Sequence, residues 1–163
     1  MPLILTLTLD EPAQARFDAL RAAHFPPERN HLAAHVTLFH ALPDADAIRQ
    51  DVREAARRAP FAVRVPRLRS LGKGVAYVLE APELTEVRRD LAYGWASLLT
   101  PQDRQRHAAH VTVQNKVAPD RARALLEELS AGFTPYDVTA TGLALWRYLG
   151  GPWEHVETAP FVG

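Results

Sequence analysis

Apolar and polar positions follow two different periods along the chain, and together they predict a mixture of strands and helices. Short runs rich in β-branched and aromatic residues predict strands, whereas longer stretches with apolar residues three and four positions apart predict helices. The expected strands lie at 2–9, 36–39, 61–65, 75–79, 111–117, 136–140 and 153–158, and the expected helices at 11–24, 44–59, 82–99 and 120–129. This pattern predicts an α+β protein.

The order β-α-β-α-β occurs twice, and the two copies keep the same register. Residues 33–38 read AAHVTL and residues 108–113 read AAHVTV, which places His35 and His110 75 positions apart. Two copies of a unit are too few for a solenoid, so the repeat predicts a pair of lobes related by a pseudo-twofold axis.

We therefore expect one bilobal, duplicated domain over residues 1–163. Lobe 1 is expected to span about 1–72 and lobe 2 about 73–163, with the terminal strands able to exchange lobes. Two antiparallel-rich sheets are expected to face a central cleft, with the helices on the outside.

Composition narrows the possible partners. The 163-residue chain carries 19 Lys and Arg against 19 Asp and Glu, and a protein that grips long nucleic acids usually carries a basic excess. The balance favours a small or short phosphorylated substrate.

Cysteine is absent, which excludes disulfides and thiolate metal sites. The N-terminus has no signal-peptide pattern, and no apolar run is long enough for a membrane span. We expect a cytoplasmic monomer with no membrane association.

The candidate chemistry lies in the two His-x-Thr segments. Because side chains two positions apart in a strand point to the same face, His35 shares a face with Thr37, and His110 with Thr112. A pseudo-twofold axis would bring the two faces together across a cleft. The same alternation extends the two faces to three candidate substrate-binding residues: Phe39, Gln114 and Lys116.

Two imidazoles and two hydroxyls around one point suit phosphodiester chemistry. Displacement at phosphorus requires a base on the attacking oxygen and an acid on the leaving oxygen, and histidine can serve as either near neutral pH. The hydroxyls of Thr37 and Thr112 can donate hydrogen bonds to the non-bridging phosphate oxygens. This scheme requires no metal and no cofactor.

At these residues the sequence resembles the two-histidine phosphoesterase superfamily, in particular its 2′-5′ RNA ligase and cyclic phosphodiesterase branch. The stretch from Gln102 to Val117 is especially similar. The resemblance implies cleavage of 2′,3′-cyclic phosphate ends of RNA or nucleotides, or reversible 2′-5′ joining of RNA ends. It implies His35 and His110 as the acid/base pair and Thr37 and Thr112 as phosphate holders.

Two further features concern the substrate. Many members of the branch carry an Arg shortly after the second motif, where this chain has Asn115 and Lys116. Tyr148, just before Gly150 and Gly151, is a candidate to border the cleft and contact a base, since aromatic rings stack on nucleobases.

Two other interpretations remain open at the level of sequence. His31 and His35 are four positions apart and His107 and His110 three, spacings that would bring metal ligands together on a helix and would suit a zinc hydrolase. Alternatively, the cleft could bind nucleotides or RNA without turnover.

Overall fold

Two antiparallel sheets and five α-helices form the molecule, which we describe from a computed structural model covering residues 1–163. None of the helices is long and apolar enough to span a membrane. The strands are β1 (Leu3–Leu9), β2 (Val36–Leu42), β3 (Phe61–Val65), β4 (Leu68–Ser70), β5 (Val75–Val78), β6 (His110–Gln114), β7 (Tyr136–Tyr148) and β8 (Trp153–Pro160). The helices are α1 (Glu11–His24), α2 (Asp46–Ala55), α3 (Pro82–Gly94), α4 (Pro101–Arg104) and α5 (Pro119–Ala131), with a 3₁₀ turn at Pro27–Arg29.

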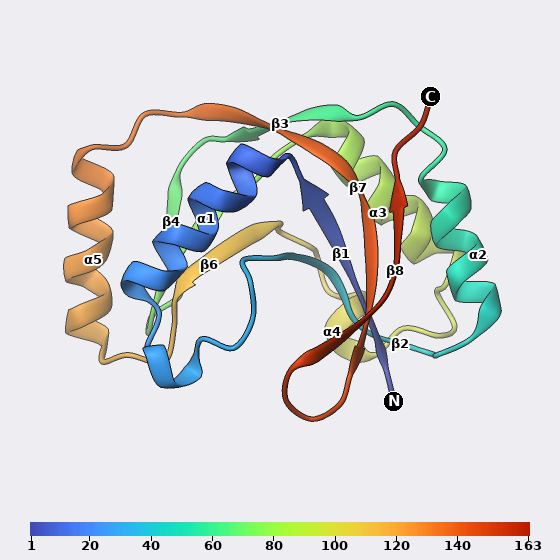
Figure 1. The fold of residues 1–163 in the computed structure, drawn as a ribbon, viewed down its shortest axis with the longest axis horizontal. Coiled ribbons are helices and arrows are strands. Elements are labelled where there is room, and N and C mark those ends of the chain that lie inside the picture. The colour runs from blue at the N-terminus through green and yellow to red at the C-terminus, as the bar shows by residue number, and fades with distance from the viewer.

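The larger sheet has the order β2-β1-β7-β3, with β8 paired to β7, and the smaller sheet has the order β4-β5-β6. In Figure 1, α1 and α5 lie with the smaller sheet in one lobe, whereas α2 and α3 lie with the larger sheet in the other. The α+β, bilobal architecture is confirmed. The sheets do not divide at residue 72, because β4 leaves the first lobe to pair with β5, and β7 and β8 pair with strands from the N-terminal half or with each other.

The pseudo-twofold axis is visible in the pairing of β3 with β7. Val63 pairs with Val138, 75 positions further along the chain, which is the offset between the two histidines. The pairs on either side, Phe61 with Ala140 and Val65 with Tyr136, exchange under the same offset. The axis therefore passes through the pair of valines, where the two lobes join (Figure 1).

Burial of alternating apolar residues explains why these segments form strands against helices. Leu3 and Leu5 of β1 are fully buried, as are Ile48 and Val52 on one face of α2. Burial of a side chain of this size stabilises the fold by about 1.5–3 kcal/mol relative to exposure.

The two strands that carry the His-x-Thr motifs are edge strands. β2 is the last strand of the larger sheet and β6 the last strand of the smaller one, and the two contact each other without forming a ladder. The duplicated motifs therefore lie at the junction of the two sheets.

Each motif strand contains a β-bulge directly after its threonine. Thr37 pairs with Thr6, but the next residue of β1, Leu5, pairs with Phe39, so Leu38 is the extra residue. A bulge of this kind shifts the side-chain alternation of a strand by one position.

β6 repeats the same irregularity. Thr112 pairs with Ala76, whereas Val75 pairs with Gln114, so the extra residue is Val113. Leu38 and Val113 are themselves 75 positions apart, which shows that the bulge belongs to the repeated unit.

Candidate active site

The two motif histidines make the same hydrogen bond. His35 Nδ1 lies 2.8 Å from the carbonyl oxygen of Ala33, and His110 Nδ1 lies 2.9 Å from that of Ala108. A carbonyl can only accept, so Nδ1 carries the proton and the neutral ring leaves Nε2 unprotonated and free. Each imidazole is thus held in the tautomer that can accept a proton at Nε2.

The pKa of His35 is lowered by its surroundings. Burial lowers the pKa of His35, the hydrogen bond to Ala33 works in the opposite direction, and the charges of Arg21, His110 and His40 lower the pKa further. Burial and these charges together favour the neutral form of His35, in which Nε2 can accept a proton.

Thr37 and Thr112 are both partly buried, and their backbones, not their hydroxyls, are engaged. The carbonyl of Thr37 accepts a hydrogen bond from His107 Nε2 at 2.9 Å, and the carbonyl of Thr112 accepts one from Arg21 Nη1 at 2.9 Å. No hydrogen bond within the protein uses either hydroxyl, so both are available to a ligand.

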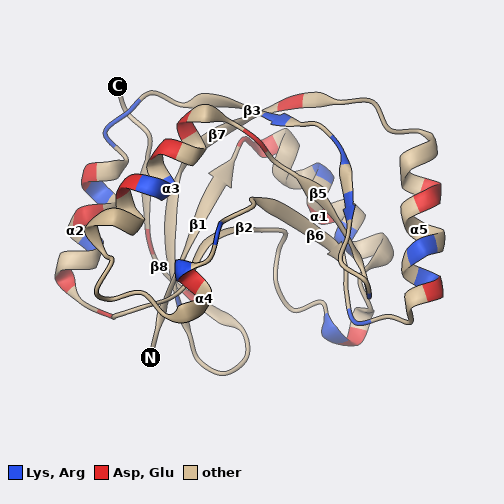
Figure 2. Ribbon diagram, turned by 180° about the vertical axis from the view of Figure 1, so that it is seen from behind, with Lys and Arg blue, Asp and Glu red and all other residues tan.

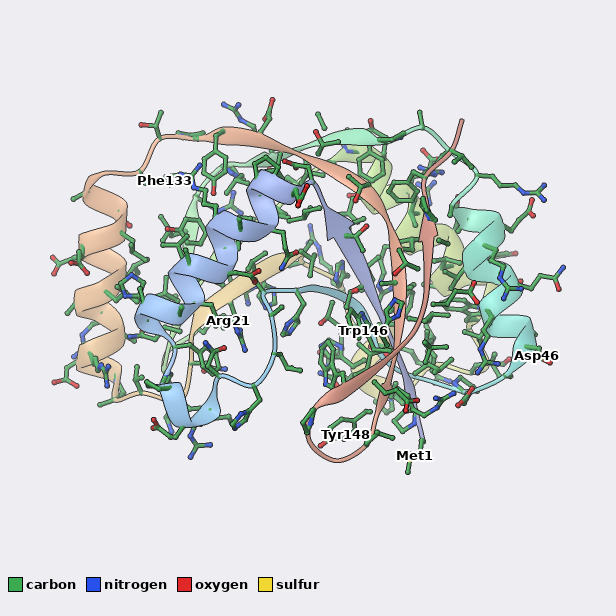
Figure 3. All side chains as sticks on the ribbon, viewed as in Figure 1. Met1, Arg21, Asp46, Phe133, Trp146 and Tyr148 are labelled. Carbon is green, nitrogen blue, oxygen red and sulfur yellow. The ribbon has the colours of Figure 1, made fainter.

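An aromatic group borders His35. The ring of Trp153, at the start of β8, lies 4.7 Å from the His35 ring, and Trp146 lies 6.2 Å from Trp153. Trp146 in turn donates its indole N–H to the hydroxyl of Thr6 at 2.9 Å. Figure 3 shows Trp146 near the centre of the molecule and Tyr148 at the β7–β8 hairpin. Sequence reasoning missed Trp153, because only the hairpin brings it to a residue more than 100 positions earlier.

Two buried arginines connect the two halves of the chain at the motif strands. Arg21, on α1 (Figure 3), donates to Thr112 in β6, and Arg88, on α3, donates from Nε to the carbonyl of Leu38 in β2 at 2.7 Å. Each helix thus supplies a guanidinium to the motif strand of the other half of the chain. These bonds satisfy carbonyls that an edge strand with a bulge leaves without a strand partner.

The buried carboxylate of Asp103 accepts hydrogen bonds from two backbone amides of β2. It accepts from the backbone N–H of His40 at 2.9 Å and of Ala41 at 2.9 Å, and from His40 Nδ1 at 3.2 Å. The side chain of Asp103 is only 1% exposed. Asp103 therefore anchors α4 to the edge strand that carries the first motif.

A cavity of about 190 Å³ opens beside His110 and draws its lining from both sheets and from α3 and α4. His40 and Leu38 come from the larger sheet, and Arg69 and His110 from the smaller one. The cavity gives the junction of the two sheets a space in which a ligand can lie against His110.

Two of the expected substrate contacts do not lie on the predicted face, and the bulges explain why. Phe39 is fully buried, with its ring 5.1 Å from Trp95 and the Arg88 guanidinium 3.8 Å from its centre. Gln114 is 3% exposed and lines a different cavity, between α1 and α5. In both strands the extra residue after the threonine turns the next position to the opposite face.

Lys116 does not share the face of His110. β6 ends at Gln114, and Lys116 lies in the following turn with a φ of 61°, where it lines a separate cavity with Lys73 and Pro119. Tyr148 is 44% exposed and pairs with Trp153 in the β7–β8 hairpin, so its contact with a base remains a prediction.

The histidine pairs considered as metal ligands do not lie on helices. His35 directly precedes β2 and His110 begins β6, and His107 is engaged with Thr37. No group of three or more His, Asp or Glu side chains is arranged to hold a metal ion.

Two lobes with a duplicated His-x-Thr strand at their junction define the class of two-histidine phosphoesterases. The profile of the 2′-5′ RNA ligase superfamily matches residues 9–152. The chain belongs to this superfamily and is a 2′-5′ RNA ligase-like phosphoesterase.

Solved structures share the fold at low sequence identity. The protein TT0787 of Thermus thermophilus is 18% identical with a TM-score of 0.72, and the alignment covers 100% of this chain and 99% of that chain. The LigT protein of E. coli in complex with 3′-AMP is 16% identical with a TM-score of 0.59, covering 99% and 98%. No curated protein matches the sequence.

Proposed function

We propose that the chain hydrolyses 2′,3′-cyclic phosphate ends of RNA or nucleotides without a metal, with His35 and His110 as the acid/base pair. The observation that carries this proposal is the identical Nδ1 hydrogen bond of the two histidines. It leaves Nε2 of each neutral ring unprotonated and without a hydrogen-bond partner in the protein.

The reaction needs one proton removed and one supplied. One imidazole, neutral at the start, takes the proton of a water molecule at Nε2 as the water oxygen attacks phosphorus. The other starts as an imidazolium, protonated at both nitrogens, and gives its Nε2 proton to the ribose oxygen as the bond from that oxygen to phosphorus breaks. Thr37 and Thr112 donate hydrogen bonds to the non-bridging oxygens, which gain charge in the transition state. With a ribose 5′-hydroxyl as the attacking group and the 3′-oxygen leaving, the same residues would form a 2′-5′ bond.

Two observations support a nucleotide substrate. The free hydroxyls of Thr37 and Thr112 have no role within the protein. E. coli LigT, which shares the fold, has been solved in complex with 3′-AMP, a nucleoside monophosphate with its phosphate at the position that a cyclic 2′,3′-phosphate would occupy.

Hydrolysis of a 2′,3′-cyclic nucleotide by purified protein in excess chelator tests the proposal. We expect turnover to a nucleoside monophosphate, and a loss of about 10²- to 10⁴-fold in kcat for either His35→Ala or His110→Ala, the usual contribution of one general acid or base. His31→Ala, which removes an exposed histidine near the first motif, is the matched control and should keep its activity.

Two results would contradict the proposal. Turnover retained in His110→Ala would remove the role assigned to that residue. A cyclic nucleotide that binds but is recovered unchanged would instead identify a binding module.

A further inference from the structure

The cavity beside His110 is strongly basic. Its lining includes Arg69, Arg88 and Arg106 together with the rings of His40, His107 and His110, and we call this space the anion pocket. Figure 2 shows basic positions at the end of α4, in the segment that leads from it to β6, and along β4. These segments supply two of the three arginines.

The lining contains one acidic residue, Asp103, which is buried. Both carboxylate oxygens of Asp103 are occupied by the amides of His40 and Ala41, and the side chain is 1% exposed. An anion that enters the pocket therefore meets hydrogen-bond donors and no free carboxylate.

Arg69 and Arg106 are exposed and form no ion pair. Their neighbours behave differently, since Arg64 and Arg67 are each paired with a carboxylate, Asp137 and Glu80 respectively. Two guanidinium groups are thus left free where they line the pocket.

On the buried side of the pocket the positive charge belongs to Arg88, and the nearby charge of Asp103 offsets part of it. Arg88 donates to the carbonyls of Leu38 and Asp103, at 2.7 and 2.8 Å, and has no carboxylate oxygen within ion-pair distance. Burial lowers the pKa of His107, and the charge of Arg88 lowers it further against the opposing hydrogen bond to Thr37. A bound anion would relieve this positive field.

Size and position fit a phosphate group. The volume of about 190 Å³ far exceeds the roughly 10–15 Å³ that holds one water molecule when volume is measured in the same way. His110 belongs both to this lining and to the proposed acid/base pair. A group held in the pocket would therefore be adjacent to the phosphate that reacts.

We propose that the anion pocket binds a second phosphate of the substrate, so that the enzyme favours nucleotides or RNA ends with a further phosphate over a nucleoside with the cyclic phosphate alone. This inference rests on the proposed function, because it takes the reacting phosphate to lie at His110. Arg69 and Arg106 would hold the second phosphate through charge-assisted hydrogen bonds, which are among the strongest that proteins form.

Equilibrium binding tests the pocket separately from catalysis. Adenosine 3′,5′-bisphosphate and adenosine 3′-monophosphate are titrated by calorimetry at constant ionic strength. We expect the bisphosphate to bind at least about tenfold more tightly, equivalent to 1.4 kcal/mol. The preference should fall below about threefold in the Arg69→Ala/Arg106→Ala variant. Arg104→Ala, which removes an exposed arginine of α4 outside the lining, is the control and should keep the preference.

The outcomes separate the two proposals. An equal affinity for the two ligands, or an equal loss of affinity for both in the double variant, would overturn the proposal that the anion pocket binds a phosphate. Inorganic phosphate that binds together with the 3′-monophosphate, without any preference for the bisphosphate, would overturn its assignment to the substrate. If the protein shows no turnover but prefers the bisphosphate, and this preference depends on Arg69 and Arg106, the result would support the phosphate-binding role of the pocket and refute the proposed hydrolysis.

Discussion

The anchoring role of Asp103 leads to a prediction about stability that does not depend on the reaction. In Asp103→Ala, the backbone N–H groups of His40 and Ala41 lose their acceptor. An unsatisfied buried donor costs about 1–3 kcal/mol. The side chain of His40 is 49% exposed, so water can reach part of this region and the total should stay near the lower end, at about 2–4 kcal/mol.

Thermal and urea unfolding followed by circular dichroism measure this loss. For a chain of this length 1 kcal/mol corresponds to about 2–4 °C in Tm, so Tm should fall by about 5–15 °C. Asp103→Asn preserves the size of the side chain but replaces one acceptor with a donor, and at least half of the loss should remain. That variant separates the missing acceptor from a simple cavity.

Asp90→Ala is the matched control. Asp90 lies on the surface of α3 and contacts Arg89 in an exposed pair, and such a change usually alters stability by less than about 0.5 kcal/mol. A loss of less than about 1 kcal/mol in Asp103→Ala, or a loss equal to that of the control, would refute the anchoring role.

Three further predictions concern the site. Trp153→Ala exposes His35 to water, so the pKa of His35 should rise towards its ordinary value in an NMR titration. Trp153→Phe should preserve most of the shift. An unchanged pKa in the alanine variant would contradict the contact between Trp153 and His35. His35 and His107 both have pKa values below the ordinary 6.5 in the folded protein. Below about pH 6.5 the unfolded chain therefore takes up protons first, and the free energy of unfolding should decrease as the pH falls. His107→Gln should make this decrease less steep in urea unfolding between pH 7 and 5.5, and an identical slope would count against it. Thr112→Val should lower kcat about 10²-fold or more, as expected for loss of a donor to a charged oxygen; Thr112→Ser should retain most activity, and equal rates in the two variants would exclude the hydroxyl.

The duplication was readable from the sequence because the motif strands repeat nearly letter by letter. Alternation places Val36 and Val111 on the face opposite to the motif histidines and threonines, and both valines are indeed buried, at 1% exposed. The rule failed two residues beyond each threonine, at Phe39 and Gln114, because an alternating pattern contains no signal for an extra residue. Leu38 and Phe39 are both apolar and both fully buried, so the hydrophobic pattern does not show which of them is the extra residue.

The contacts that complete the site come from outside the repeat. Trp153 reaches His35 through a hairpin, and Arg69 and Arg106 reach His110 from a short strand and from the segment after α4. Neither β4 nor α4 has a hydrophobic period, because three or four residues are too few to show one. Arg21 and Arg88 look like ordinary polar positions of amphipathic helices, and only the tertiary fold reveals that they are buried.

In each half of the chain an arginine bonds the motif strand of the other half, and this reciprocal contact limits how such a protein could arise. Half of the chain, folded alone, would expose the carbonyls of its motif strand and would deprive its arginine of the carbonyl that it bonds in the other half. An ancestor with a single repeat would therefore have needed a second copy of itself, with each subunit completing the other's edge strand. On this view, gene fusion made permanent a twofold dimer that already carried one histidine in each subunit, and the two sites became free to diverge, as Trp153 beside His35 and the arginines beside His110 now show.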